Sequence, residues 1–261
     1  MTTERPAAAP VGRHALPDWP RQGRAVHGLF DRHGGVSAGP FASLNVGTAV
    51  GDAPEAVREN RRRVADAMGA PAAPLVVAEQ VHGREVARID VLPSAPPRAD
   101  ALVTRRTDCT LMVFTADCVP LLYAAPQAVA VAHAGWRGAA AGVAPATLAA
   151  LCEYGGVEVD QVEVAIGPAI GPCCYQVDAT RAGALERACA GAGVRWQGAH
   201  AARIDLVALV SAQLRAAGVP ATQVRVLAAC TACGDGWFSH RAGRGHSGRQ
   251  ASCLRRRGDA S

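Results

Sequence analysis

The sequence predicts an α/β fold, a single layered domain in which mixed β-sheets are covered by helices. Extended apolar runs alternate with helical stretches from residue 25 to residue 254, and 49% of the 261 residues are hydrophobic, enough to cover a substantial core. We expect a loose N-terminal tail at 1–23, because its Pro, Ala and Arg residues follow no periodicity. The single domain then occupies 24–255, and 256–261 form a C-terminal tail.

The first half begins with a strand at 25–30 and a Gly- and Ser-rich loop at 31–47. A helix follows at 51–70, with Asp52 as its expected N-cap, Glu55 three residues later and Gly69 at its end. Its buried stripe comprises Val57, Val64 and Met68. Further strands are predicted at 75–83, 84–92, 99–104, 110–114, 121–123 and 128–134.

The second half continues the alternation of helices and strands. A turn at 135–138 leads into an alanine-rich helix at 139–155, which Pro145 is expected to kink or offset. A strand at 162–166, a helix at 178–193 and an amphipathic helix at 205–219 follow, and Asp205 is the expected N-cap of the last. A strand at 224–230 and a last short strand near the C-terminus complete the prediction.

Composition excludes several classes of function. The formal charge of +5 is spread along the chain, which indicates neither a nucleic-acid nor a membrane partner. All 27 basic residues are arginine, so chemistry that requires lysine is excluded and anions must bind to arginine or to backbone amides. Without a signal peptide or a long apolar span, the protein is expected to be cytoplasmic, with its nine cysteines as thiols.

Three side chains at predicted strand ends form the main candidate site: His82, Cys118 and His133. Two imidazoles and a thiolate are ligands that zinc accepts, and a fourth position left to water is typical of a catalytic site. The same residues also suit a cysteine nucleophile with a histidine base, oriented by Asp117 or by a backbone carbonyl. The sequence does not separate these two chemistries.

A second candidate metal site lies near the C-terminus. Cys230 and Cys233 form a C-x-x-C motif that His240 and His246 follow, although the spacing is shorter than in a zinc finger. The adjacent Cys173 and Cys174 would point to opposite faces of an extended chain, which indicates packing residues.

Four arginines lie in or beside glycine-rich turns, where a ligand can approach the backbone. They are the candidate anion-binding residues, and the alternative for each is a solvated surface position. The four are Arg32, Arg137, Arg241 and Arg249.

Seven ordered motifs between residues 25 and 254 together carry a resemblance to a known family. They are HGLFDRHGGVSAGPFASLNVG, EQVHG, ADALVT, TADCVPLLY, AHAGWRG, AIGPAIGPCCYQV and CTACGDGWFSHRAGRGHSGRQ. This sequence resembles the bacterial laccase-domain family, formerly labelled multicopper polyphenol oxidase and now regarded as purine nucleoside phosphorylase. It departs from the family's first motif, where GLFD replaces the more usual G-F-S-T.

The resemblance implies one zinc ion held by His82, Cys118 and His133. It further implies phosphorolysis of adenosine, inosine and methylthioadenosine with inorganic phosphate as co-substrate, and deamination of adenosine. The older oxidase label fits poorly, because the chain has eight histidines and no His-x-His pair, although copper could occupy the trio adventitiously. A cysteine hydrolase, such as a peptidoglycan-editing amidase, and a non-catalytic zinc-binding partner protein remain alternatives. The oligomeric state stays open.

Overall fold

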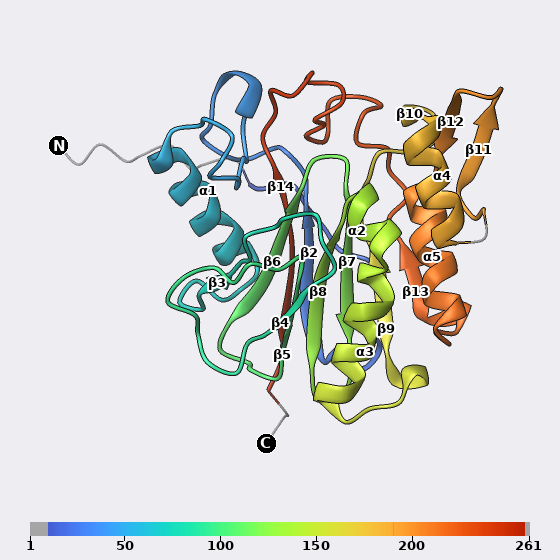
Figure 1. Cartoon of the computed structure of the whole chain (residues 1–261). Helices are drawn as coiled ribbons and strands as arrows, with labels where there is room; N and C mark the ends of the chain where they lie inside the picture. The colour runs from blue at the N-terminus through green and yellow to red at the C-terminus, as the bar shows by residue number, and fades with distance from the viewer. Residues whose placement is uncertain (1–9, 190, 259–261) are drawn as a thin grey trace.

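Two mixed β-sheets pack face to face, and helices cover the outer face of each (Figure 1). The structure is a computed structural model that describes residues 10–189 and 191–258. It confirms the predicted α/β fold with mixed sheets covered by helices. Within the described ranges, no helix combines the length and apolar character needed to cross a bilayer.

The five-stranded sheet has the order β1-β2-β14-β6-β3. Its strands pair antiparallel except for β3, which runs parallel to β6. The C-terminal strand β14 pairs on both sides, so the end of the chain completes the middle of this sheet. The bounds are Arg13–His14 (β1), Ala25–Phe30 (β2), Leu75–Val76 (β3), Thr110–Thr115 (β6) and Gln250–Arg256 (β14).

The six-stranded sheet has the order β13-β9-β7-β8-β5-β4. The outer pairs β13–β9 and β4–β5 are parallel, and the pairs between them are antiparallel. The bounds are Val86–Arg88 (β4), Ala101–Thr104 (β5), Val119–Ala124 (β7), Val129–Ala134 (β8), Glu163–Ile166 (β9) and Val224–Val226 (β13).

Alternation along the strands divides the core into layers. In β8, Val129 and Val131 pack toward the five-stranded sheet, whereas Ala130 and Ala132 pack toward the helices. Strands buried on both faces read as continuous apolar runs, which is why the sequence shows no polar alternation here. The layer between the sheets includes Leu29, Leu102, Leu111, Val113, Leu122 and Leu254.

Helices close the two outer faces of the sandwich. Helix α1 (Pro54–Ala67) covers the five-stranded sheet, and its predicted stripe of Val57, Val64 and Met68 is buried. Helices α2 (Trp136–Ala141), α3 (Val143–Gly155) and α5 (Leu206–Ala216) cover the six-stranded sheet (Figure 1).

Helix α4 (Ala179–Ala188) packs against α2 and a small three-stranded sheet that the sequence analysis did not predict. This sheet has the order β10-β12-β11, with bounds Gln176–Asp178 (β10), Val194–Gln197 (β11) and Ala201–Ile204 (β12). Single turns of 3₁₀ helix lie at Arg21–Gly23, Gly39–Phe41, Val159–Gln161 and Ala221–Gln223.

The predicted N-terminal tail is wrong for residues 10–23, which are folded against the five-stranded sheet. This segment contributes β1, and its Leu16 and Trp19 are buried. The physical reason is His27 in β2, whose Nε2 accepts a hydrogen bond from the Leu16 amide at 2.8 Å and whose ring lies edge-on against Trp19. Residues 1–9 and 259–261 of the predicted tails lie outside the described residues, and β14 extends to Arg256.

Two helix boundaries also differ from the prediction. Helix α1 has Ala53 as its N-cap, because the Asp52 carboxylate instead accepts hydrogen bonds from Ser37 and Asn45. The alanine-rich segment breaks at Gly142, where φ is +80°, and Pro145 lies in the first turn of α3, where proline needs no amide partner. The N-cap predicted for α5 is confirmed, since the carboxylate of Asp205 accepts from an amide in the first turn.

Candidate metal centre and active site

Cys118 lies where the chain crosses from one sheet to the other. Strand β6 belongs to the five-stranded sheet and β7 to the six-stranded sheet, and residues 116–118 connect them. Asp117 has a φ of +86°, in the left-handed region that aspartate visits more readily than most residues. Asp117 and Cys118 lie between two apolar strands because the chain turns here from one sheet to the other. This turn places the Cys118 thiol at the end of the sandwich.

The carboxylate of Asp117 holds the long segment between β13 and β14 against this turn at two points. The Thr231 hydroxyl donates to its Oδ1 at 2.7 Å, and the Arg241 amide donates to its Oδ2 at 2.7 Å. Both carboxylate oxygens of Asp117 thus accept hydrogen bonds from this segment, and the prediction that Asp117 orients a histidine is wrong.

The carboxylate that orients His133 is Asp100. His133 is the second-last residue of β8, is 3% exposed, and places Nδ1 2.8 Å from Asp100 Oδ1. Burial would raise the pKa of Asp100, but hydrogen bonds from His133 and from the amides of His82 and Gly83 outweigh burial and lower it. The ionised carboxylate accepts and Nδ1–H donates, which leaves Nε2 of His133 for the centre.

His82 lies in the loop between β3 and β4, and the same carboxylate positions it. Three consecutive amides of residues 81–83 donate to Asp100 at 3.2, 2.9 and 2.6 Å. His82 takes a φ of +61°, a strained conformation for a non-glycine residue that this set of hydrogen bonds holds in place. The predicted strand at 75–83 is therefore shorter than expected, and β3 and β4 lie in different sheets.

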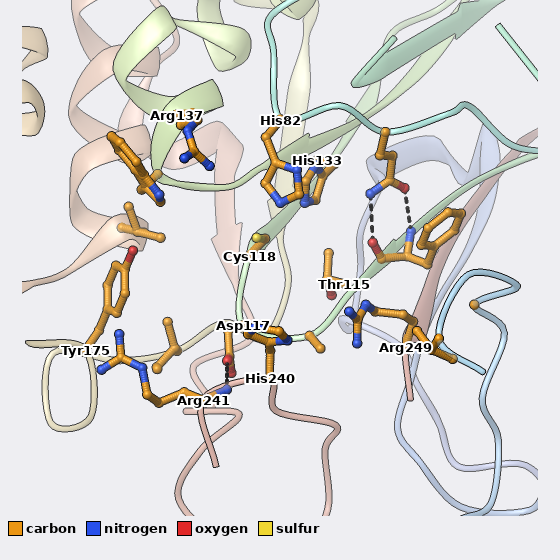
Figure 2. A pocket seen from close by; sticks show the side chains of 18 of the residues that line it. His82, Thr115, Asp117, Cys118, His133, Arg137, Tyr175, His240, Arg241 and Arg249 are labelled. Carbon is orange, nitrogen blue, oxygen red and sulfur yellow. Dashed lines mark hydrogen bonds between the residues drawn. The ribbon is translucent and has the colours of Figure 1, made fainter. Parts of the chain in front are cut away.

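The structure brings His82, Cys118 and His133 together (Figure 2). One ligand atom from each lies within 4.8 Å of the others, and the two imidazole rings are perpendicular with centroids 4.7 Å apart. In a tetrahedral site with Zn–N of about 2.0 Å and Zn–S of about 2.3 Å, such ligand atoms lie about 3.3–3.6 Å apart. The residues present therefore fit a zinc ion after small side-chain adjustments.

Gly135 leaves the space that this arrangement needs. A Cβ at this position would lie 2.8 Å from Cδ2 of His82 and 3.0 Å from Sγ of Cys118. Gly135 has a φ of −73°, which any residue can adopt, so the requirement for glycine here is steric.

Charge at the centre favours the thiolate of Cys118. Burial opposes ionisation of the thiol, but the neighbouring His133 and His82 prevail and lower its pKa to about 6. Burial likewise opposes charge on His133, but Cys118 and Asp100 raise the pKa of that imidazole to about 9. A thiolate is the form in which cysteine binds a metal or attacks an electrophile.

The three residues line a cavity of about 510 Å³. This volume lies within the usual range for small-molecule sites, and the lining combines apolar and aromatic surface with a few charged groups. Side chains from both sheets, from α2 and from the C-terminal loops meet here (Figure 2). The lining includes Phe114, Trp136, Arg137, Tyr175, Arg181, His240, Arg241 and Arg249.

Three of the four predicted arginines line this cavity. Arg137 lies in the first turn of α2 over the ring of Trp136, and Arg241 lies over the ring of Tyr175. Arg249 also lines it, and burial lowers the pKa of its guanidinium. Arg32 is not among the lining residues, because its guanidinium donates to the Ala42 carbonyl at 2.7 Å and lies over Phe238.

Four residues of the site were not predicted from the sequence: Asp100, Trp136, Tyr175 and Arg181. Asp100 is fully buried between apolar neighbours at the start of β5, and a carboxylate in that position was a signal that could have been followed. Trp136, Tyr175 and Arg181 had no such signal, since an aromatic residue is usually core and an arginine on a helix is usually solvated.

The predicted C-terminal metal site has different members from those expected. Cys230 and Cys233 lie together with Cys173 and Cys174, and the potential ligand cluster found in the described residues does not include His240 or His246. The prediction that Cys173 and Cys174 are packing residues on opposite faces is wrong, because residues 172–174 form a turn that points both sulfurs toward Cys233.

Comparisons with known proteins give relatives along most of the chain. YlmD of Geobacillus stearothermophilus, named a purine nucleoside phosphorylase, is 39% identical over 250 residues, 89% of this chain and 90% of the relative. A purine nucleoside phosphorylase of Xylella fastidiosa is 36% identical over 249 residues, with 90% and 94% covered. YfiH of Escherichia coli, also named a purine nucleoside phosphorylase, is 39% identical over 164 residues, 62% of this chain and 65% of the relative.

Two solved structures are similar to this chain over nearly its whole length. The crystal structure of YlmD from Geobacillus stearothermophilus matches with a TM-score of 0.88 at 36% identity, covering 97% of this chain and 98% of that one. That of the Bacillus licheniformis protein YfiH matches with a TM-score of 0.88 at 30% identity, with 95% and 97% covered.

A family model also matches most of the chain. The model described as multi-copper polyphenol oxidoreductase laccase matches residues 26–257, which include both sheets from β2 onward and every residue of the centre. Relatives named as phosphorylases support an enzyme in this family. The chain belongs to the multi-copper polyphenol oxidoreductase laccase family, and its curated relatives are named purine nucleoside phosphorylases.

Proposed function

We propose that the protein is a zinc-dependent purine nucleoside phosphorylase that acts on adenosine, inosine and methylthioadenosine and also deaminates adenosine. The observation that carries the proposal is the convergence of His82, Cys118 and His133 in a cavity whose walls present arginines and aromatic rings. The names of the relatives supply the substrate class, and the cavity volume suits a nucleoside.

His82, Cys118 and His133 would hold the zinc ion, with Asp100 keeping His133 in the tautomer that presents Nε2. A zinc ion in this position supplies a Lewis acid that can polarise a substrate group or activate water. Two imidazoles beside one thiolate favour this use of Cys118, because a cysteine nucleophile needs one histidine base and leaves the second histidine without a role.

Phosphate and purine would bind next to each other in the cavity, because Arg137 lies over the ring of Trp136 and Arg241 over the ring of Tyr175. Arg137 and Arg241 are the proposed phosphate ligands, since both guanidiniums line the cavity and arginine binds phosphate through paired N–H donors. The Arg241 main chain is fixed by its hydrogen bond to Asp117. The rings of Trp136 and Tyr175 offer faces on which a purine can stack.

Phosphorolysis joins a phosphate oxygen to C1′ of the ribose as the bond from C1′ to the purine nitrogen breaks, and the purine leaves with a proton. The arginines place the phosphate and neutralise its charge, which lowers the barrier for attack by an anion. Deamination requires water and releases ammonia, so phosphate should be needed for the first reaction only.

The test incubates the protein with adenosine, inosine or methylthioadenosine, with and without inorganic phosphate. Ribose 1-phosphate should form from adenosine and inosine only when phosphate is present, whereas inosine should form from adenosine without it. Both activities should fall more than about 100-fold in His82→Ala, Cys118→Ala and His133→Ala, because each change removes a direct metal ligand. Cys152→Ala, in α3, is the matched control. Free ribose as the sole sugar product would contradict phosphorolysis.

A cysteine hydrolase is the second candidate, and one observation favours it. Cys118 lies within 4.8 Å of a ring nitrogen of His133, and Asp100 holds Nδ1 of that ring, which is the order of nucleophile, base and orienting carboxylate. Hydrolysis of an amide or a peptide-linked amino acid that survives chelation, is lost in Cys118→Ala and occurs without nucleoside turnover would establish this candidate instead.

A non-catalytic zinc-binding partner protein is the alternative from a different class. Chelation that abolishes turnover, followed by restoration with zinc, would separate the enzyme from a binder. Restoration should be tested with copper as well, because copper binds most nitrogen and sulfur sites more tightly than zinc and would occupy this centre adventitiously.

A further inference from the structure

Four cysteines from two distant segments converge outside the centre described above. Cys173 and Cys174 come from the loop after β9, and Cys230 and Cys233 from the loop after β13. All four sulfurs lie within 4.8 Å of one another, in a group separate from that of His82, Cys118 and His133. Sγ of Cys233 lies 3.4 Å from Sγ of Cys173 and 3.3 Å from Sγ of Cys174.

The main chain builds this cluster from both sides. Ala169 and Cys230 form a parallel β-bridge, which aligns the two loops. The amide of Gly171 donates to Sγ of Cys230 at 3.2 Å, and the amide of Cys174 donates to the Gly171 carbonyl at 3.0 Å, closing the turn that carries the adjacent cysteines. A second turn, closed by the Cys233 amide on the Cys230 carbonyl at 3.3 Å, brings the C-x-x-C sulfurs to the same side.

The sulfur geometry fits a metal better than disulfides. In a disulfide the sulfurs are bonded at about 2.05 Å in separate pairs, whereas here one sulfur contacts two others at longer range. A tetrahedral Zn²⁺ with Zn–S bonds of about 2.3 Å holds its four sulfurs about 3.8 Å apart, close to the separations observed. We propose that Cys173, Cys174, Cys230 and Cys233 bind a second Zn²⁺ as a closed four-thiolate structural site.

This site would fix one wall of the cavity. Tyr175 directly follows Cys174, and Arg241 donates from Nη1 to the carbonyls of Cys174 and Gln176 at 3.4 and 3.2 Å. Thr231, between the C-x-x-C cysteines, donates to Asp117 beside Cys118. A metal that joins the loop after β9 to the loop after β13 would therefore hold Tyr175 and Arg241 in the cavity wall. It would also support the turn at Asp117. Cys173 and Cys233 are exposed, so the metal and chelators can reach the site from solvent.

Elemental analysis of protein purified under reductant with zinc tests the proposal without reference to activity. Wild-type protein should contain about two zinc ions per chain, and Cys118→Ala and Cys173→Ser about one each. The double variant should contain none. Cys152→Ser, a half-buried cysteine outside both groups, is the control and should keep both ions and the wild-type Tm, whereas Cys173→Ser should lower the Tm. A wild-type content of one zinc that Cys173→Ser leaves unchanged would overturn the proposal.

X-ray absorption at the zinc edge tests the wild-type protein, so its result does not depend on whether a cysteine variant folds. Two occupied sites give an average of about 2.5 sulfur neighbours per zinc, whereas the histidine-rich centre alone gives about one. An average near one, or mass spectrometry that finds disulfides among the four cysteines of the reduced, zinc-supplied protein, would exclude the four-thiolate site. Because neither readout measures turnover, failure of the proposed phosphorylase function would leave this result unaffected.

Discussion

Asp100 is the residue on which the geometry of the centre depends most. One buried carboxylate accepts from three consecutive amides around His82 and from Nδ1 of His133, so it sets the positions of two of the three side chains that could hold a metal. Such carboxylates behind a metal-binding histidine fix its tautomer and raise its basicity.

We expect Asp100→Asn to lower zinc affinity about 10–100-fold, because the amide removes the charge and turns an N–H donor toward groups that also donate. Zinc competition with a chromophoric chelator measures this. Asp108→Asn, which removes an exposed carboxylate paired with Arg106, is the control and should leave the affinity unchanged. Equal affinity of Asp100→Asn and wild type would show that Asp100 does not position the ligands.

Gly135 provides the second test at the scale of one residue. Gly135→Ala places a Cβ 2.8 Å from Cδ2 of His82 and 3.0 Å from Sγ of Cys118, so these side chains would have to shift from the positions that bring them together. We expect reduced zinc content without backbone strain, since alanine readily adopts the extended φ of −73° at this position. Gly236→Ala, whose Cβ meets no atom within 4 Å, should keep the metal. Full zinc content in Gly135→Ala would mean that the ligands adapt.

At the scale of elements, strand β2 fixes the N-terminal segment through His27. Burial, with a smaller contribution from the charge of Arg13, lowers the pKa of His27 to about 4 from its ordinary 6.5. The neutral ring is needed because its Nε2 accepts from the Leu16 amide.

This shift predicts a pH-dependent stability. Because the folded-state pKa lies below the unfolded value, the unfolded chain binds more protons between about pH 6.5 and 4, and stability falls as the pH drops through that window. The contribution is fully present above about pH 6.5 and amounts to at most about 3–4 kcal/mol. Denaturant unfolding of wild type and His27→Gln across this range should give curves that converge toward low pH. Parallel curves would contradict the assignment.

Helix α4 offers a site where a substitution should stabilise the fold. Gly183 lies in its interior, and an added Cβ would meet only the flexible end of Arg187 at 3.4 Å. Gly183→Ala should therefore raise the free energy of unfolding by about 0.5–1 kcal/mol, through the lower conformational entropy of the unfolded chain. Urea unfolding measures the change. A loss of stability would show that the helix has no room for the methyl group.

At the scale of the whole molecule, the layer between the two sheets holds the fold together and aligns the centre. Leu122 in β7 is fully buried in this layer, while Leu92 is 43% exposed. We expect Leu122→Ala to cost about 2–5 kcal/mol, because it leaves a cavity in a close-packed core, and Leu92→Ala to cost less than about 1 kcal/mol. A single cooperative denaturant transition in both variants would be consistent with the sheets unfolding together. Equal costs would place the main core elsewhere.

Local patterns account for the parts of the fold that the sequence predicted well. The buried stripe of α1, its end at Gly69, the N-cap of α5 and the strands β7 and β8 all follow from periodicity, capping chemistry or φ preference within a few residues. His82, Cys118 and His133 were recognisable because polar ligands beside glycine or at breaks in apolar runs are unusual in a core.

The remaining features depend on contacts between segments that are distant in the chain. Asp100 meets His133 across 33 residues, and Cys173 meets Cys233 across 60. A strand that is buried on both faces is apolar along its whole length in either sheet. The hydrophobic pattern therefore could not show that β6 and β7 belong to different sheets. The sequence by itself determined most of the elements and the candidate side chains His82, Cys118 and His133. Only the tertiary structure decided which of them meet, because sheet pairing and loop packing are set by burial of the whole core.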